Sequence, residues 1–248
     1  MSIDLADYKT KARSAVKTFW LSRKIAGTKK QTVGSKDWRK RNVHTSGGSM
    51  DGFIDLVIDI VHANGLPDAD IMRKGRGLLL PGHFGPVKSW DVIVMNHGNL
   101  IAVIKFDAQV GPSFRKKAIS SCDQAISLAV DLQAAYRRDT FGVYARPFVG
   151  YLCLLEDSTA SRAPVKDISP NFPLVREYRN ASYAKRYKIL CKKLIMDGFY
   201  TDASVILSHR SASKSGEYSE MSKLTGLTSF VAGLAARVAM EAYKSRRK

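Results

Sequence analysis

Residues 90–107 read WDVIVMNHGNLIAVIKFD, and the strand pairing expected here sets the centre of the fold. Two apolar runs, 91–95 and 100–106, flank the turn signal NHGN at 96–99. Apolar runs joined by a short Gly-containing turn are typical of an antiparallel hairpin. The sequence therefore predicts two paired strands here, with the start of the first strand close to the end of the second.

Helices and strands alternate after this hairpin. A helical pattern at 114–138 is followed by an apolar run at 148–155, which indicates a strand–helix–strand crossover. Helices are also predicted at 182–196 and 227–243, and a strand at 203–208. We therefore expect an α/β fold with a central mixed β-sheet flanked by helices. In the helix at 114–138 the periodicity turns one apolar face inward: Ile119, Cys122, Ile126, Ala129 and Leu132.

The N-terminal part is helical and basic. Apolar residues recur at helical spacing from Leu5 to Leu21, and we expect Gly27 to end this helix. The polar segment 28–49 is expected to be flexible or ordered only by a ligand. A second helix is predicted at 50–63, stopped by an Asn-Gly pair. With no further linker, we expect one domain over 1–248 with a basic helical N-terminal extension of about 1–50.

The charge balance favours a polyanionic partner. The 248 residues contain 40 Lys and Arg against 22 Asp and Glu, a formal net charge of +18. Residues 1–50 hold 12 basic and three acidic side chains, a surplus of 9 that is half of this excess. Such a surface suits DNA, RNA, anionic lipid or simple solubility, and any single basic run is better explained by solvated charge.

The sequence also indicates the cellular compartment of the protein. No apolar run approaches the roughly 20 residues that a bilayer span requires, so we expect no membrane segment. The start of the chain is acidic and does not resemble a signal peptide. Three widely spaced cysteines, Cys122, Cys153 and Cys191, are expected to be reduced and buried, as in a cytoplasmic protein.

The hairpin carries the candidate chemistry. Asp91 begins the first strand, and Lys105 and Asp107 lie two residues apart at the end of the second, on one face. Two carboxylates and an ammonium suit phosphodiester hydrolysis, in which oxygen ligands hold Mg²⁺ and Lys orients the nucleophile. The alternative is that Lys105 and Asp107 are solvated charges at a strand end. The five histidines lack metal-ligand spacing to one another.

The register of the hairpin decides whether Asp91 joins the other two groups. For Asp91 to share a face with Lys105 and Asp107, it must pair with an odd-numbered residue, which calls for an odd loop such as 97–99. A two-residue loop would turn Asp91 to the other face. The sequence leaves both registers open.

The chain resembles the XhoI family of type II restriction endonucleases over nearly its whole length. The similar segments are, in chain order, GGSMDGF (47–53), NGLPDA (64–69), LPG (80–82), VGPSF (110–114), SPNFP (169–173), ASY (181–183), ASVILS (203–208) and TGL (225–227). Collinear matches of this kind are more specific than any single motif. The resemblance implies a PD-(D/E)xK nuclease fold, Mg²⁺ dependence, a homodimer, and double-stranded DNA with the palindrome CTCGAG as substrate in a restriction system.

The departures from the family fall in the active-site strand. The family pattern has an Asp at position 91 and Glu-x-Lys where this chain has Lys105-Phe106-Asp107, so acid and lysine are exchanged. The resemblance implies Asp91 and Asp107 as metal ligands and Lys105 as the catalytic lysine. Either the nuclease survives with altered geometry, or Lys105 repels Mg²⁺ and the protein is an impaired or inactive DNA-binding homologue.

The candidates for DNA backbone contact lie beside this strand in sequence. They are four basic residues, each of which is equally well explained as a solvated charge: Lys88, Arg115, Lys116 and Lys117. In the family's pattern an Asn-rich segment stands where the last three occur, so base specificity stays open.

Overall fold

The hairpin predicted from residues 90–107 lies inside a six-stranded sheet. The computed structural model describes residues 3–32, 50–142 and 145–247. β4 (Val92–Asn96) and β5 (Asn99–Gln109) pair antiparallel, as predicted. The strand order is β1-β4-β5-β6-β7-β8, with the short β1 (Asp70–Met72) and β8 (Ser219–Glu220) at the two edges.

The sheet is mixed because helices connect its three longest strands. β5, β6 (Phe148–Glu156) and β7 (Asp202–Ser208) run parallel, and α4 (Phe114–Tyr136) and α6 (Tyr183–Met196) lie in the two connections between them. The remaining pairs are antiparallel. The predicted α/β fold with a central mixed sheet is confirmed, and the carboxyl ends of the parallel strands share one edge.

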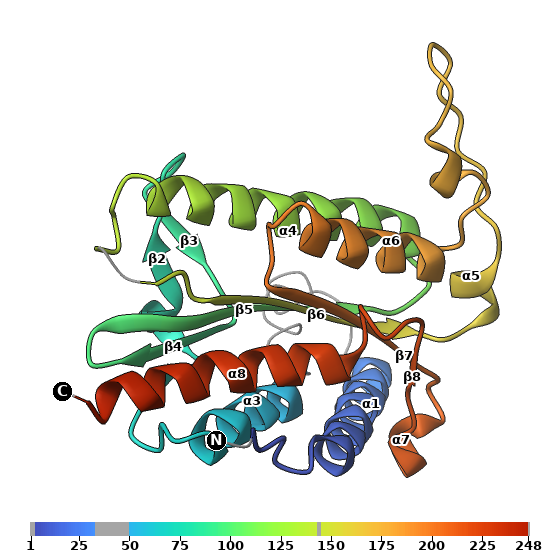
Figure 1. The fold of residues 1–248 in the computed structure, drawn as a ribbon. Helices are drawn as coiled ribbons and strands as arrows, with labels where there is room; N and C mark the ends of the chain where they lie inside the picture. The colour runs from blue at the N-terminus through green and yellow to red at the C-terminus, as the bar shows by residue number, and fades with distance from the viewer. Residues whose placement is uncertain (1–2, 33–49, 143–144, 248) are drawn as a thin grey trace.

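Helices cover both faces of the sheet (Figure 1). α4 and α6 pack on one face; α1 (Tyr8–Thr32), α3 (Asp51–Ala63) and α8 (Leu227–Ser245) pack on the other. All nine residues of β6 are buried, because a central parallel strand has a hydrophobic layer on each side. In the part of the chain that the structure describes, no helix combines the length and the hydropathy that a bilayer crossing needs.

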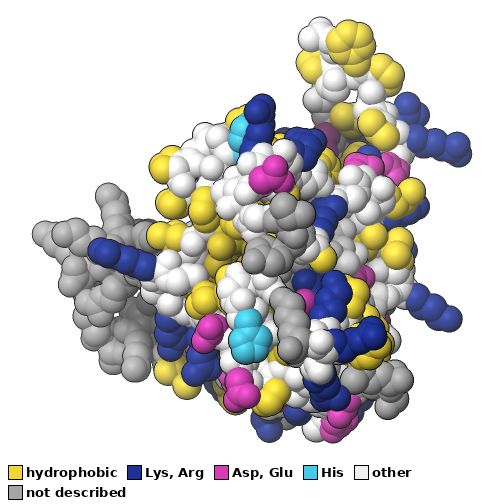
Figure 2. Space-filling view, turned by 60° about the vertical axis from the view of Figure 1, so that its left-hand side comes forward, with side chains coloured by type: hydrophobic (Ala, Val, Ile, Leu, Met, Phe, Trp, Pro, Cys, Tyr) yellow, Lys and Arg dark blue, Asp and Glu magenta, His cyan; other side chains and the backbone are white. Residues whose placement is uncertain are grey.

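Shorter elements surround this core. η2 (Gly75–Leu78) leads into a separate two-stranded hairpin of β2 (Leu79–Pro81) and β3 (Val87–Ser89). The others are α5 (Thr159–Arg162), η3 (Arg176–Tyr178) and α7 (Ala212–Ser215). The segment between α5 and α6 projects from the body (Figure 1), and hydrophobic side chains gather at its tip (Figure 2). Three of its exposed side chains are apolar: Ile168, Phe172 and Val175.

Helix α1 is longer than predicted. It continues through Gly27 to Thr32, because a single glycine lowers helix propensity by about 1 kcal/mol without breaking a helix. The connection predicted at 28–49 therefore begins later, and its residues 33–49 lie outside the described ranges. Where α1 crosses α3, a Cβ on Gly52 would lie 2.7 Å from Ala15 Cα, so the close approach that fixes the start of α3 requires glycine.

The inward face predicted for α4 was partly wrong. Ile119 is 59% exposed and Ile126 is 37% exposed. Ala129 and Leu132 are buried as predicted, and Ala125 is buried with them. Small side chains let the helix lie close to the sheet, so the larger isoleucines are directed away from it.

Candidate active site

Asp91 and Lys105 face each other across the antiparallel strands of the hairpin. Val92 pairs with Ile104, so the residue before β4 lies opposite Lys105. The Lys105 Nζ lies 2.9 Å from Asp91 Oδ2, and the Phe106 amide donates to the same oxygen at 2.7 Å. The pair is only partly exposed, with 22% of the Lys105 side chain and 31% of the Asp91 side chain accessible. The ammonium therefore offsets the charge of this carboxylate.

A β-bulge sets this register. The hairpin loop has two residues, His97 and Gly98, whose φ angles of 47° and 79° fit a type I′ turn. A regular ladder from this loop would turn Asp91 away from the face of Lys105. The pairing instead shifts by one residue within the hairpin, because a bulge adds an unpaired residue to one strand. The condition that only an odd loop could bring Asp91 to this face was therefore wrong, because the bulge places Asp91 on the face of Lys105 and Asp107 with a two-residue loop.

The carboxylate of Asp107 is held by neighbouring donors. Its Oδ1 accepts from the Ala108 amide at 2.7 Å and from Gln109 Nε2 at 2.9 Å. Its Oδ2 lies 3.0 Å from Gln109 Nε2 and accepts from the Tyr151 hydroxyl at 3.0 Å. Gln109 Nε2 also lies 2.6 Å from Ser121 Oγ on α4. Both oxygens of Asp107 are thus engaged by the protein.

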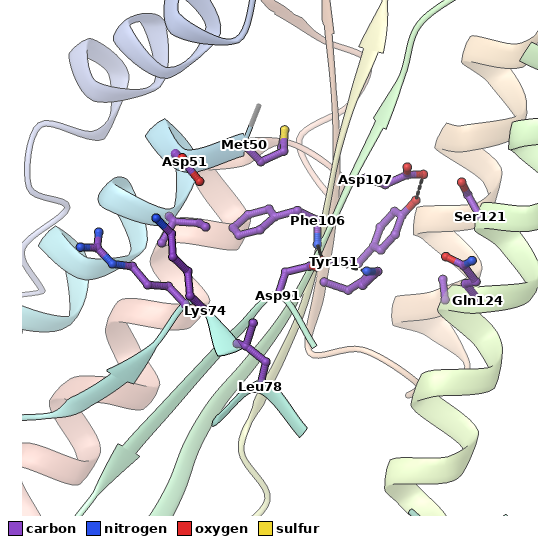
Figure 3. A pocket seen from close by; sticks show the side chains of 14 residues that line it. Met50, Asp51, Lys74, Leu78, Asp91, Phe106, Asp107, Ser121, Gln124 and Tyr151 are labelled. Atoms are coloured by element: carbon purple, nitrogen blue, oxygen red, sulfur yellow. Dashed lines mark hydrogen bonds and ion pairs between the residues drawn. The ribbon is translucent and has the colours of Figure 1, made fainter. Parts of the chain in front are cut away.

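Asp91, Lys105 and Asp107 line a cavity of about 490 Å³ between α3, α4 and the sheet. Figure 3 shows Asp51 and Lys74 on one side of it and Asp107 and Gln124 on the other. Arg73 also lines the cavity and lies 3.4 Å from Asp55. The cavity therefore brings together acidic and basic side chains from four separate parts of the chain.

The buried groups behind Asp107 stay protonated. Burial, and then the negative charge of Asp107, raise the pKa of the Tyr151 hydroxyl well above its usual value, which keeps it a hydrogen-bond donor. Burial likewise raises the pKa of the thiols of Cys153 and Cys191. These two cysteines and the less buried Cys122 are free, as predicted, and the raised pKa values make nucleophilic roles for the buried pair unfavourable.

The donor set does not fit a divalent cation as it stands. Asp91 Oδ2 and both oxygens of Asp107 already accept hydrogen bonds from the protein. The Lys105 ammonium lies where a cation bound to Asp91 would need negative charge. Among residues 3–32, 50–142 and 145–247, no three His, Cys, Asp or Glu side chains group as metal ligands. We therefore assign no step of a reaction to a bound ion in this arrangement.

Three of the predicted DNA-contacting residues lie together. Arg115, Lys116 and Lys117 occupy the first turn of α4, close after the carboxyl end of β5. Arg115 is 71% exposed at its side chain and lies 3.8 Å from Asp167. The Lys117 ammonium donates to the Val110 carbonyl at 3.3 Å. All three basic residues are exposed at the edge of the sheet that holds the cavity.

Lys88 lies elsewhere. It is on β3 and its Nζ is 3.6 Å from Asp131, a side chain that is only 2% exposed. Burial raises the pKa of Asp131, but hydrogen bonds from the His83 and Phe84 amides and the charge of Lys88 together lower it by more, so the net shift is downward. Asp131 thus stays ionised and fixes the tip of the β2–β3 hairpin. Lys88 lines a second hollow beside Phe84 and does not line the cavity of Asp91.

Sequence reasoning missed the side chains that support Asp107. In the sequence, Tyr151 is distinguished only by its hydroxyl group within an apolar run, and no pattern marks Gln109 or Ser121 as functional. Their roles arise from the parallel pairing of Asp107 with Cys153, and from the packing of α4 on that face. Contacts of this kind depend on tertiary structure.

Comparisons with known proteins all lead to one family. The family model for restriction endonuclease XhoI matches residues 29–220. The chain is 40% identical over 202 residues to the type II restriction enzyme XhoI of Xanthomonas vasicola, covering 80% of each protein. It is 44% identical over 179 residues to type II restriction enzyme AbrI of Azospirillum brasilense, covering 72% of this chain and 80% of the relative.

A third relative aligns over almost its whole length. Type II restriction enzyme BstVI of Geobacillus stearothermophilus is 33% identical over 218 residues, which is 86% of this chain and 96% of the relative. No solved structure matches the chain.

Proposed function

This protein belongs to the XhoI restriction endonuclease family, and we propose that it acts on double-stranded DNA at a palindromic site, CTCGAG by family resemblance. The observation that carries the proposal is the shared cavity of Asp91, Lys105 and Asp107, the three groups that the family resemblance implies for catalysis. A palindromic target suits a homodimer, because each subunit then meets one half-site and one strand.

The basic side chains beside the cavity supply the affinity. Arg115 and Lys116 extend from the exposed first turn of α4, and Arg73 and Lys74 line the cavity from the segment after β1. Contacts from Lys and Arg to phosphates fix a protein on the duplex without reading its sequence. We assign Arg115, Lys116 and Lys117 to this role. Lys88, which is paired with Asp131, is the weakest of the predicted contacts.

Lys105 would meet the scissile phosphate. Its ammonium has Asp91 as its ion-pair partner, and a phosphate entering the cavity is a second anionic partner for the same group. Asp107 is kept in place by Tyr151 and Gln109. Type II restriction endonucleases generally need a divalent metal ion, and Mg²⁺ is the ion that the family resemblance names, but the present donor set does not fit it.

The ion pair between Lys105 and Asp91 favours a second candidate function. In this alternative the protein binds its site and cleaves it slowly or not at all. An ammonium 2.9 Å from the first carboxylate competes directly with a cation for that ligand. Binding depends on the surrounding basic side chains and does not require Asp91 to be free.

Plasmid cleavage separates the two functions. Supercoiled plasmid carrying one CTCGAG site would be incubated with the protein and Mg²⁺ or EDTA, beside a plasmid whose site is changed at one base pair. Linear product only from the intact site and only with Mg²⁺ supports the endonuclease. Intact plasmid together with a site-specific gel shift in EDTA supports the binding homologue. If the protein produces no cleavage and no gel shift, the assignment to this DNA site is refuted.

A further inference from the structure

A cluster of basic side chains surrounds Glu156 at the carboxyl edge of the sheet. Glu156 ends β6, Arg210 follows β7, Lys117 lies in the first turn of α4, and Arg23 lies on α1. We call Arg23, Lys117 and Arg210 the basic cluster. Its members come from three parts of the chain that are far apart in sequence, so only the fold brings them together.

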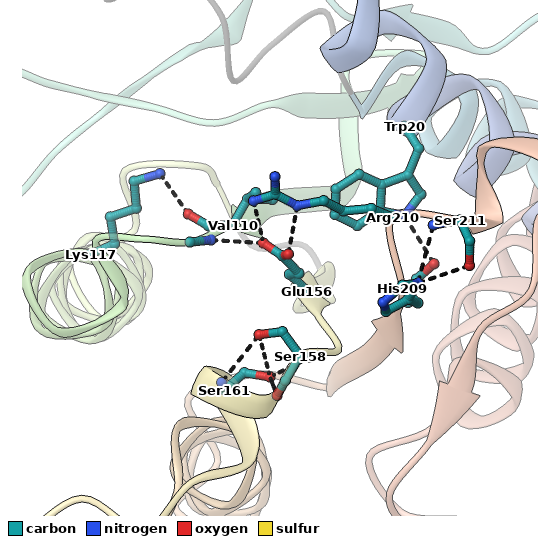
Figure 4. Close-up of polar contacts among 11 residues, drawn as sticks. Trp20, Val110, Lys117, Glu156, Ser158, Ser161, His209, Arg210 and Ser211 are labelled. Carbon is teal, nitrogen blue, oxygen red and sulfur yellow. Dashed lines mark hydrogen bonds and ion pairs between the residues drawn. The ribbon is translucent and has the colours of Figure 1, made fainter. Parts of the chain in front are cut away.

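Glu156 orients Arg210. The Glu156 side chain is 8% exposed, and its oxygens accept from Arg210 Nε at 2.6 Å and Nη2 at 3.1 Å. The Gly111 amide donates to the same carboxylate at 2.9 Å. Figure 4 shows Arg210 meeting Glu156 between the ends of the strands, with Lys117 on the far side of Val110. A guanidinium has five N–H donors, so these two contacts leave others of a 60% exposed side chain for a ligand.

Positive charge exceeds negative charge here. Three cations lie near two carboxylates, Glu156 beside Arg210 and Arg23, and Asp107 beside Lys117. The Arg23 Nε is buried with no acceptor among the described residues. Arg23 stacks over the Phe19 ring at 4.9 Å, which fixes the guanidinium in place. Burial, and then the charge of Arg210, lower the pKa of Arg23; partial burial, and then Arg23, lower the pKa of Lys117. The protein alone therefore disfavours the charges that it places together, and an anion would offset them.

The start of α4 adds to this imbalance. Its first turn contains no acidic residue and three basic ones, although the positive end of the helix dipole favours negative charge. Basic side chains at a helix N-terminus are stabilised when an anion binds beside them. The basic cluster and the α4 N-terminus meet at Lys117, and both favour an anion there.

We infer that the basic cluster binds a backbone phosphate of the DNA, with Glu156 as the residue that positions Arg210. This inference rests on the proposed function, which supplies the polyanion. None of Arg23, Lys117 and Arg210 lines the cavity of Asp91 and Lys105, so this phosphate is distinct from the phosphate facing Lys105. Planar guanidinium groups with a lysine suit phosphate oxygens in particular.

The variants R23Q and K117Q test this site. Each removes one cation without touching Asp91, Lys105 or Asp107. R138Q is the matched control, because Arg138 is exposed just beyond the other end of the 23-residue α4. Equilibrium binding of a CTCGAG duplex would be measured in EDTA over a range of KCl concentrations. Circular dichroism and thermal melting would show that each variant is folded, and either variant alone suffices if the other fails to fold.

We expect R23Q and K117Q to bind about 10-fold or more weakly than wild type, since hydrogen bonds between charged groups are strong. The slope of log K against log salt should become shallower by about 0.9 for each phosphate that the variant no longer neutralises. An uncharged methylphosphonate would replace one backbone phosphate of the duplex at a time. It should weaken wild-type binding at the position that the basic cluster contacts. At that position it should not weaken the binding of R23Q any further. R138Q should match wild type throughout.

The outcomes separate this inference from the proposed function. Wild-type affinity, salt slope and methylphosphonate profile in folded R23Q and K117Q would overturn the phosphate site and leave the DNA-binding function standing. Failure of the wild-type protein to bind any duplex would overturn both. A loss of affinity in R138Q equal to that of R23Q would show a general effect of charge and would also overturn the site.

Discussion

The double variant K105E/D107K reverses the order of the charged groups on β5 and leaves their sum unchanged. One Lys and one Asp are replaced by one Glu and one Lys, so the net charge stays at +18. The strand then carries the Glu-x-Lys order of the family pattern. Any change in cleavage must therefore come from the positions of the groups and not from the long-range attraction of DNA.

The expected size of the effect follows from the ion pair. A divalent ion bound about 2 Å from an Asp91 oxygen would lie about 4 Å from the present ammonium, which is 2.9 Å from Oδ2. Unit charges at 4 Å interact by about 4 kcal/mol at an effective dielectric constant near 20, and a divalent ion doubles this to about 8 kcal/mol. Water reaches both side chains and screens much of it. A quarter of this value, about 2 kcal/mol, corresponds to about 30-fold in ion affinity.

We expect K105E/D107K to cleave CTCGAG plasmid with Mg²⁺ at least about 30-fold faster than wild type, measured as the initial loss of supercoiled DNA. Mg²⁺ should also raise the melting temperature of the variant more than that of wild type, since a ligand that binds only the folded state stabilises it. The matched control is K105Q/D107N. It keeps the net charge, removes the ammonium and builds no Glu-x-Lys, so it should stay slow.

Rapid cleavage by wild type that disappears in K105E/D107K would refute this reasoning, because it would assign the activity to the present order of Lys105 and Asp107. Equal salt slopes for DNA binding in EDTA are the control that all three proteins share one binding mode. A variant that binds with a different slope could not be compared by its cleavage rate.

Three further predictions concern separate parts of the molecule. D91A should abolish whatever cleavage wild type shows while duplex binding in EDTA stays within about threefold; undiminished cutting would remove Asp91 from the mechanism. Burial raises the pKa of Asp202 to about 7, above about 3.9 in the unfolded chain, so the folded state keeps a proton that the unfolded chain releases. The free energy of unfolding should therefore fall as pH rises from about 4 to 7, and it should fall less in D202N than in wild type. Urea midpoints at pH 5 and pH 8 would measure both falls, and equal falls in the two proteins would contradict this. Light scattering should give a solution mass of twice 27.5 kDa, and a monomer at all concentrations would contradict the homodimer.

Local sequence signals predicted most of the fold because they depend on near neighbours. The hairpin at 90–107 has a Gly-containing turn between apolar runs, and helix α3 stops where Asn64-Gly65 was expected to stop it. The two-residue strand β8 was missed because so short an edge strand is defined by its partner. The extension of α1 past Gly27 was missed because one glycine is a weak stop signal.

The candidate site was predictable in its residue types but not in its register. The spacing of Lys105 and Asp107 puts them on one face by the two-residue period of a strand. The alignment of Asp91 depends on a β-bulge within the hairpin, for which the sequence gives no distinct signal. The contact of Tyr151 with Asp107 depends on β5–β6 pairing, and the basic cluster depends on α1, α4 and β7 meeting at one edge.

Asp91 and Glu156, the two carboxylates at this edge, each form an ion pair with a basic side chain. This arrangement favours DNA binding and opposes metal-dependent cleavage. Asp91 holds Lys105 at 2.9 Å, and Glu156 holds Arg210 at 2.6 Å. In each pair an acid fixes a basic group, and the further basic side chains around the pairs supply the positive charge that attracts phosphates. At Asp91 the Lys105 ammonium opposes a divalent cation. Exchanging Lys105 and Asp107 should relieve this conflict at the catalytic strand alone, because the basic cluster around Glu156 keeps its charge.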